Sequence, residues 1–257
     1  MKRVLTAIAL IPPAAYLAVW APYWALTAAV AALALVCFHE YRHLLRAMGM
    51  ETLGPFGYAA GLVILLAPRA ETLMVTLLAV LALALSLRAS DPARALPQAA
   101  LLLFGAIYVF GCWRCALGLR QISPYWLLYA LMINWVGDIS AFYFGRKFGK
   151  HRLAPGLSPK KTWEGSIASV AGSCVLGGAF LYFLIPGISI PEILILTVLA
   201  NVAGQFGDLC ESAIKRGAGV KDSGTFLPGH GGWLDRLDSS LFAMPVVFFW
   251  LLRPWEA

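Results

Sequence analysis

Charged residues are scarce in this 257-residue chain: Asp, Glu, Lys and Arg together make up 13% of it, whereas a soluble domain carries about a quarter. Hydrophobic residues make up 60%, and the mean hydropathy is +0.76. This shortage of charge excludes an ordinary soluble globular domain. The alternation of polar and apolar residues that marks a transmembrane β-barrel is also lacking, so we expect an all-α protein.

Long linkers, low-complexity tracts and convincing internal repeats are lacking as well. Instead, apolar runs recur that are long enough to cross roughly 30 Å of hydrocarbon. We predict a polytopic integral membrane protein with about nine transmembrane helices. Their expected positions are 4–20, 22–38, 54–68, 72–87, 97–113, 124–144, 164–185, 191–212 and 234–252. The first run contains Pro12 and Pro13 and another span follows at once, so we expect a retained, kinked helix rather than a signal peptide.

Cysteine is sparse, and its five residues contain only one CxxC pair, Cys112 and Cys115. A lone CxxC is weak evidence for a disulfide or a metal site, and we expect incidental packing. His39, Glu40 and His43 match the H-E-x-x-H pattern of zinc metalloproteases. They lie at the cytoplasmic end of an expected span, where charged residues are usual. A zinc protease is therefore the weaker alternative.

Basic residues are distributed unevenly over the expected loops. With the N-terminus inside, the inner segments hold sixteen of the twenty Lys and Arg residues, and Arg69, Arg114, Arg120 and Arg253 lie outside. Basic loops are the cytoplasmic ones, so we expect a cytoplasmic N-terminus in a bacterial inner membrane. The net charge of +7 then suits anionic headgroups or an anionic cytosolic substrate. No nucleic-acid partner is expected.

Three aspartates are expected at one face of the membrane. Asp208, Ser212 and Lys215 are spaced i, i+4 and i+7, so they share one face of a helix. Asp235 and Asp238, three residues apart, point to one side of the last span. Carboxylates in a membrane are costly unless they are paired or bound to metal, and hard oxygen ligands suit Mg²⁺. A structural Asp–Lys pair and the helix dipole are the alternatives.

Two loops, 145–163 and 214–233, are expected on the cytoplasmic side of a catalytic region that spans 131–257. Residues 1–130 are expected to be scaffold, dimer-forming or lipid-facing helices. Lysines and hydroxyls of the first loop suit phosphates, and glycines of the second permit close backbone approach. The candidates are Ser158, Lys160, Lys161, Thr162, His230, Gly231 and Gly232. A plain positive-inside signal and a tight turn are the alternatives, and the role of the histidine stays open.

One further pair lies in the sixth expected span, where Asn134 and Asp138 are spaced i, i+4. Such a pair serves equally well as a helix-packing network or as one wall of a ligand site.

The stretch "SAIKRGAGVKDSGTFLPGHGGWLDRLD", residues 212–238, resembles the signature of the phosphatidate cytidylyltransferases, also called CDP-diacylglycerol synthases. The block from Asp138 to Gly165 is similar to the region that precedes it in this family. Together the resemblance covers roughly residues 130–240. Trp233 departs from the pattern, since the family usually has a smaller aliphatic residue there.

The resemblance implies transfer of the cytidylyl group of CTP to phosphatidate, giving CDP-diacylglycerol and pyrophosphate for phospholipid biosynthesis in a membrane-bound homodimer. It places Asp208, Asp235 and Asp238 at a Mg²⁺ site, with room for a second cation, and Lys215 beside them among the catalytic residues. The candidate substrate-binding residues are Ser212, Arg216, Lys221, His230, Gly231, Gly232, Arg236, Asp138, Ser158, Lys160, Lys161 and Thr162. A CTP-dependent polyprenol kinase and a transporter remain alternatives.

Overall fold

The helices begin and end close to the expected apolar runs. The computed structural model describes residues 2–50, 54–67, 71–87, 91–226 and 231–252, with the side chains of 2–9 and 71–73 left aside. Its helices are α1 Lys2–Val19, α2 Tyr23–Ala47, α3 Gly54–Leu66, α4 Glu71–Ser86, α5 Ala95–Ala106, α6 Cys112–Ile122, α7 Pro124–Phe148, α8 Trp163–Leu184, α9 Ile190–Gly217 and α10 Leu234–Leu251.

Several of these helices have the length and composition of membrane spans. Within the described residues, five are long and apolar enough: Tyr23–Ala47, Pro92–Ile122, Pro124–Phe148, Trp163–Leu184 and Ile190–Gly217. Three shorter apolar helices are Leu10–Val19, Gly54–Leu66 and Met74–Ser86. The chain is thus a helical membrane protein, as predicted. The number of crossings and the orientation stay predictions.

One expected loop is helical. The expected fifth span, 97–113, was followed by a loop up to residue 123, but a π-helical turn, η2 Ile107–Gly111, joins α5 directly to α6. A short 3-10 turn, η1 Pro92–Arg94, precedes them. Arg120 therefore lies in a helix, and its guanidinium donates to the carbonyl of Ala21 at 3.2 Å.

A two-stranded antiparallel hairpin interrupts the helices, which the all-α expectation did not include. Strand β1 Arg152–Ala154 pairs with β2 Ser158–Thr162, with Arg152 opposite Thr162 and Ala154 opposite Ser158. The proline at 159 favours extended backbone at Ser158. Strand β2 leads directly into α8, where the Thr162 hydroxyl accepts a hydrogen bond from the Gly165 N–H at 3.2 Å and caps the helix.

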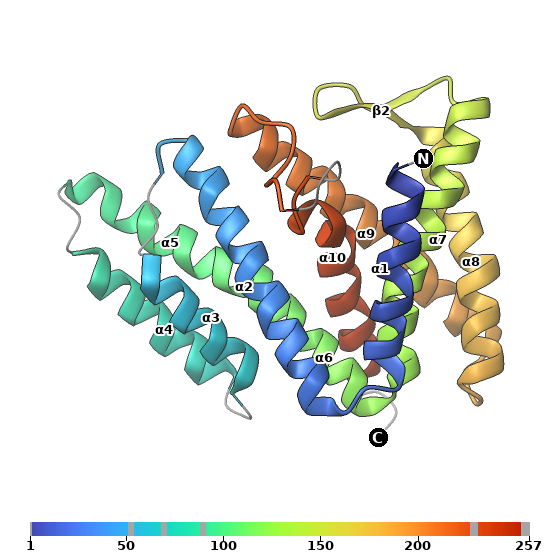
Figure 1. Cartoon of the computed structure of the whole chain (residues 1–257), viewed down its shortest axis with the longest axis horizontal. Coiled ribbons are helices and arrows are strands. Elements are labelled where there is room, and N and C mark those ends of the chain that lie inside the picture. The colour runs from blue at the N-terminus through green and yellow to red at the C-terminus, as the bar shows by residue number, and fades with distance from the viewer. Residues whose placement is uncertain (1, 51–53, 68–70, 88–90, 227–230, 253–257) are drawn as a thin grey trace.

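The two loops predicted to converge lie at the same end of the bundle (Figure 1). The hairpin between α7 and α8, the connection from α9 to α10 and the start of α1 all lie at the top of that view, while α3, α4 and α5 lie on its left side. Helices α7, α8, α9 and α10 pack against one another in sequence order, and α10 also contacts α6 and α2.

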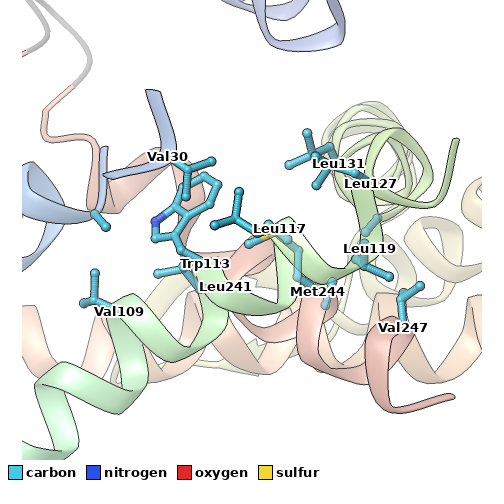
Figure 2. Close-up of a cluster of buried hydrophobic side chains, with 14 of the residues drawn as sticks. Val30, Val109, Trp113, Leu117, Leu119, Leu127, Leu131, Leu241, Met244 and Val247 are labelled. Atoms are coloured by element: carbon cyan, nitrogen blue, oxygen red, sulfur yellow. The ribbon is translucent and has the colours of Figure 1, made fainter. Parts of the chain in front are cut away.

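A buried apolar cluster fixes α10 in the bundle. Figure 2 shows side chains from α2, η2, α6, α7 and α10 that meet there. Its labelled members are Val30, Val109, Trp113, Leu117, Leu119, Leu127, Leu131, Leu241, Met244 and Val247. Close packing of this kind is the main force between helices in lipid. It holds the helix that carries Asp235 and Asp238 at a defined height and rotation.

Candidate active site

A cavity of about 1020 Å³ lies between α7, α8, α9 and α10 and reaches the hairpin and the α9–α10 connection. Most of the residues predicted for the site line it. They are Asp138, Lys160, Lys161, Thr162, Asp208, Ser212, Lys215, Arg216, Lys221, Asp235, Arg236 and Asp238. Within the described chain, Ser158, Gly231 and Gly232 are not among the lining residues. His230 lies outside the described residues.

Asp208 is paired with the hairpin. Its Oδ2 lies 2.6 Å from the Nζ of Lys161 on β2, and its Oδ1 accepts a hydrogen bond from the Ser212 hydroxyl at 3.4 Å. Asp208 and Ser212 are one turn apart on α9, as their spacing predicted. The pairing is with a lysine of the other loop, however, and not with Lys215 on the same helix.

Lys215 forms the buried centre of the site. Its Nζ donates to Glu211 on the preceding turn at 2.7 Å and to Asp235 on α10 at 2.5 Å. Lys215 is 8% exposed and Glu211 is fully buried. A lysine enclosed by two carboxylates offsets the cost of burying each of them. Glu211 was not among the predicted site residues, although its position four residues before a lysine in a membrane helix was a usable signal.

Asp235 uses both carboxylate oxygens for contacts within the protein. One oxygen accepts from Lys215, and the other accepts from the backbone N–H groups of Ser223 and Gly232, both at 2.8 Å. The Ser223 hydroxyl lies 2.9 Å from the same oxygen. Asp235 thus ties the α9–α10 connection to the lysine at the centre of the site.

Asp238 lies one turn deeper on α10 and is 7% exposed. Its Oδ1 accepts a hydrogen bond from the N–H of Ser239 at 2.6 Å, and it lines the cavity together with Asp208 and Asp138. Asn134 lies one turn before Asp138 on α7. Its amide donates to the carbonyl of Ala130 at 2.9 Å. Both members of this predicted pair therefore line the cavity wall.

The carboxylates fit a divalent cation only in part. No group of three His, Cys, Asp or Glu side chains in the described chain is arranged to hold a metal ion. All three aspartates line the cavity, but both oxygens of Asp235 are engaged by Lys215, Ser223 and Gly232. Mg²⁺ needs only one or two protein carboxylates when waters and substrate phosphates complete its shell. The donor set therefore suits Mg²⁺ that arrives with a phosphorylated ligand.

The lining of the cavity changes from charged to neutral with depth. Basic side chains gather towards the ends of the helices and in the two connections: Arg146, Arg152, Lys160, Arg216, Lys221 and Arg236. Further along α8 and α9, amides and hydroxyls form a hydrogen-bonded floor. The Asn201 amide donates to Ser169 at 3.1 Å and to Ser173 at 2.9 Å, and the Gln205 amide donates to Asn201 at 2.7 Å. A polyanion in this cavity would meet basic side chains at the helix ends and neutral polar groups further in.

The H-E-x-x-H residues do not share one environment on α2. His39 and His43 are exposed on α2, and the Nδ1 of His39 lies 3.1 Å from the hydroxyl of Tyr58. Glu40 is 1% exposed and faces the start of α10. Cys112 and Cys115 are free thiols.

Comparisons with known proteins find similar sequences. The sequence model described as "Cytidylyltransferase family" matches residues 1–253. The phosphatidate cytidylyltransferase of Staphylococcus haemolyticus (strain JCSC1435) is 42% identical over 134 residues, which is 52% of each chain. That of Bacillus subtilis (strain 168) is 42% identical over 151 residues, covering 57% of this chain and 55% of the relative. The chain thus spans about half the length of the curated relatives it matches.

Proposed function

Because the chain belongs to the cytidylyltransferase family, we propose that it transfers the cytidylyl group of CTP to phosphatidate and releases pyrophosphate. The observation that carries this proposal is the cavity, whose basic residues surround carboxylates at one end of a bundle of apolar helices. Such a site serves a reaction between a soluble polyanion and a membrane lipid. The relatives named phosphatidate cytidylyltransferase support the choice of both substrates.

In the proposed reaction a phosphate oxygen of phosphatidate attacks the α-phosphorus of CTP. A new P–O bond forms, and the bond from the α-phosphorus to the oxygen that bridges to the β-phosphate breaks. The electron pair leaves with pyrophosphate, and the lipid becomes CDP-diacylglycerol. Because the nucleophile is already an anion, the step needs positioning and charge neutralisation more than it needs a general base.

The residues of the chain would divide these tasks. Lys161, Lys221 and Arg236 line the cavity and would contact the phosphates of the two substrates. Lys215 would hold Asp235, and through it the α9–α10 connection, in place. Asp208 and Asp238 would hold Mg²⁺, which supplies further charge neutralisation when it is bound.

We also propose nine crossings of a bacterial inner membrane, with the N-terminus and the site in the cytoplasm. The start of α1, the hairpin and the α9–α10 connection share one end of the bundle (Figure 1), and the basic residues concentrate in the segments assigned to that side. Cytoplasmic segments of membrane proteins are rich in Lys and Arg. This orientation puts the cavity where CTP is available. A homodimer is proposed on the family resemblance alone.

The proposal is tested with purified protein in detergent micelles that contain phosphatidate, Mg²⁺ and CTP labelled with ³²P at the α-phosphate. We expect label to enter a chloroform-soluble product, and we expect a chelator or Asp208→Asn to abolish it. A CTP-dependent lipid kinase would leave the lipid unlabelled with α-label and label it from the γ-phosphate. A folded protein that labels no lipid from α-labelled CTP would disprove the proposed function.

A further inference from the structure

A carboxylate from the first half of the chain accepts hydrogen bonds from the start of α10. Glu40 lies on α2, and its Oε1 accepts a hydrogen bond from the Trp233 N–H at 3.0 Å. Its Oε2 accepts from the Leu234 N–H at 2.8 Å and lies 3.0 Å from the hydroxyl of Ser223. Glu40 is 1% exposed. These contacts join residues more than 180 positions apart in the sequence.

The start of α10 needs such a partner. The first N–H groups of a helix have no acceptor within the helix, and the dipole there favours negative charge. Helix α10 has no side-chain cap from its own N-cap residue, Trp233. Glu40 supplies the missing acceptor from another helix, with a full negative charge.

Asp235 also accepts hydrogen bonds from the α9–α10 connection, through Ser223 and Gly232. The hydroxyl of Ser223 is fully buried and lies 3.0 Å from Glu40 and 2.9 Å from Asp235. A hydroxyl has one proton and can donate to only one of the two carboxylates at a time. Because the Ser223 N–H also donates to Asp235, the serine is held between the two acids.

The glycines of the connection permit this arrangement. Gly231 has a φ of +77°, and a Cβ there would lie 2.6 Å from the Oδ2 of Asp235. A Cβ at Gly232 would collide with Glu40 and with Ser223. A side chain at either position would therefore push the connection away from the carboxylates. The glycine pair is needed for the close approach of backbone and acid.

The held segment carries groups of the proposed site. Lys221 and Asp222 lie just before Ser223, and Arg236 and Asp238 lie on the first turns of α10, and all four line the cavity. We propose that Glu40 is a positioning residue for the transfer reaction: together with Ser223 and Asp235 it fixes the α9–α10 connection over the cavity. This inference rests on the proposed function, since it concerns the same site.

Glu40→Gln tests the proposal because it keeps the volume of the side chain and removes one of the two acceptors. The amide nitrogen then faces a backbone N–H or the serine hydroxyl. At a temperature where both proteins are folded, we expect kcat to fall by about tenfold to a hundredfold. We also expect faster hydrogen exchange of the amides of Ser223, Gly232, Trp233 and Leu234, with α7 and α8 unchanged. His43→Ala, an exposed change one turn away on α2, is the control and should keep wild-type kinetics.

Wild-type activity separates this inference from the proposed function. If the wild type does not label phosphatidate, the proposed function fails, although the exchange experiment still reports whether Glu40 holds the connection. If the wild type is active and Glu40→Gln has the same kcat and the same local exchange, the positioning role is wrong. A loss of kcat with unchanged exchange at these amides also contradicts it, since the effect would then not pass through the connection.

Ser223→Ala provides a second test should Glu40→Gln fail to fold. Removing one buried hydroxyl is a smaller change, and we expect several-fold slower turnover with faster exchange at Gly232. Where both variants fold, the double variant should lose less than the product of the two single losses, because both changes release the same segment. Independent, multiplicative losses would overturn the shared role.

Discussion

Lys161 on β2 and Asp208 on α9 lie 2.6 Å apart, with 26% and 32% of their side chains exposed. A partly exposed pair of this kind contributes little to stability. Its position matters more, because it connects the hairpin to the helix that carries the centre of the site, and both residues line the cavity. We infer that the lysine serves the ligand, with Asp208 as its partner until an anion arrives.

The first prediction follows from this pair. Lys161→Ala should lower kcat/KM for CTP by about tenfold or more, because a cation next to the phosphates is removed, while the thermal midpoint shifts little. Lys147→Ala, an exposed lysine at the end of α7, is the matched control and should behave as wild type. Equal losses in the two variants would point to a general effect of surface charge, and salt titration of both proteins would reveal it.

The second prediction separates two lysines of the site. Lys215→Met leaves Glu211 and Asp235 buried without their shared cation. The free energy of unfolding should therefore fall by about 3–5 kcal/mol, and activity should be lost. Lys221→Met removes an exposed lysine that lines the cavity. It should reduce activity and leave stability within about 0.5 kcal/mol. Thermal unfolding in detergent, paired with the lipid-labelling assay, measures both. A stable Lys215→Met protein would contradict the buried network.

The third prediction concerns Mg²⁺. Both aspartates line the cavity, but both oxygens of Asp235 are engaged by Lys215, Ser223 and Gly232. We therefore expect Asp238→Asn and Asp235→Asn to change different kinetic parameters. Asp238→Asn should raise the Mg²⁺ concentration needed for half-maximal rate by about tenfold or more. Asp235→Asn should lower kcat with little change in that concentration. Mg²⁺ titrations of both variants measure this concentration. A larger increase in Asp235→Asn than in Asp238→Asn would place the cation on Asp235.

The fourth prediction tests the orientation. Pro155 in the hairpin turn and Pro186 between α8 and α9 are both exposed, and they flank α8 at opposite ends. Single cysteines at these positions, in a background whose five native cysteines are replaced, should react from opposite sides of the membrane. A membrane-impermeant maleimide should label residue 155 only in inverted vesicles and residue 186 only in intact cells after outer-membrane permeabilisation. The reverse pattern would exclude a cytoplasmic site.

Apolar runs and residue spacings in the sequence predicted the positions of the helices and which residues share a helix face. Apolar runs gave the starts of the helices to within about two residues, but several helices end later than their apolar runs. Helix α2 runs on to Ala47 because helix propensity continues where the apolar run stops at residue 38. The i, i+4 spacing placed Asp208 and Ser212 on one face. The hairpin was missed because strands of three and five residues in a polar loop show no apolar periodicity.

Contacts between residues far apart in the sequence could not be predicted from these local patterns. Nothing in the spacing of Asp208 indicates that its partner is Lys161 rather than Lys215. Glu40 was noticed for its neighbouring histidines, yet its significance lies in facing inward with Phe38 and Tyr41 on the buried side of α2. A glutamate at an apolar position of a helix needs a buried partner, and only the fold identifies that partner as the start of α10.

The neutral floor of the cavity has an electrical consequence. A wet, charged hollow that enters a membrane shortens the barrier that ions must cross, and each charge that crosses 100 mV dissipates about 2.3 kcal/mol. Beyond the floor, Tyr129 and Thr197 are joined at 2.8 Å, and the apolar cluster of Figure 2, with Leu127, Leu131, Met244 and Val247, follows. In the proposed orientation, these side chains would close the cavity towards the far side of the membrane. They would then keep ions from leaking through the site.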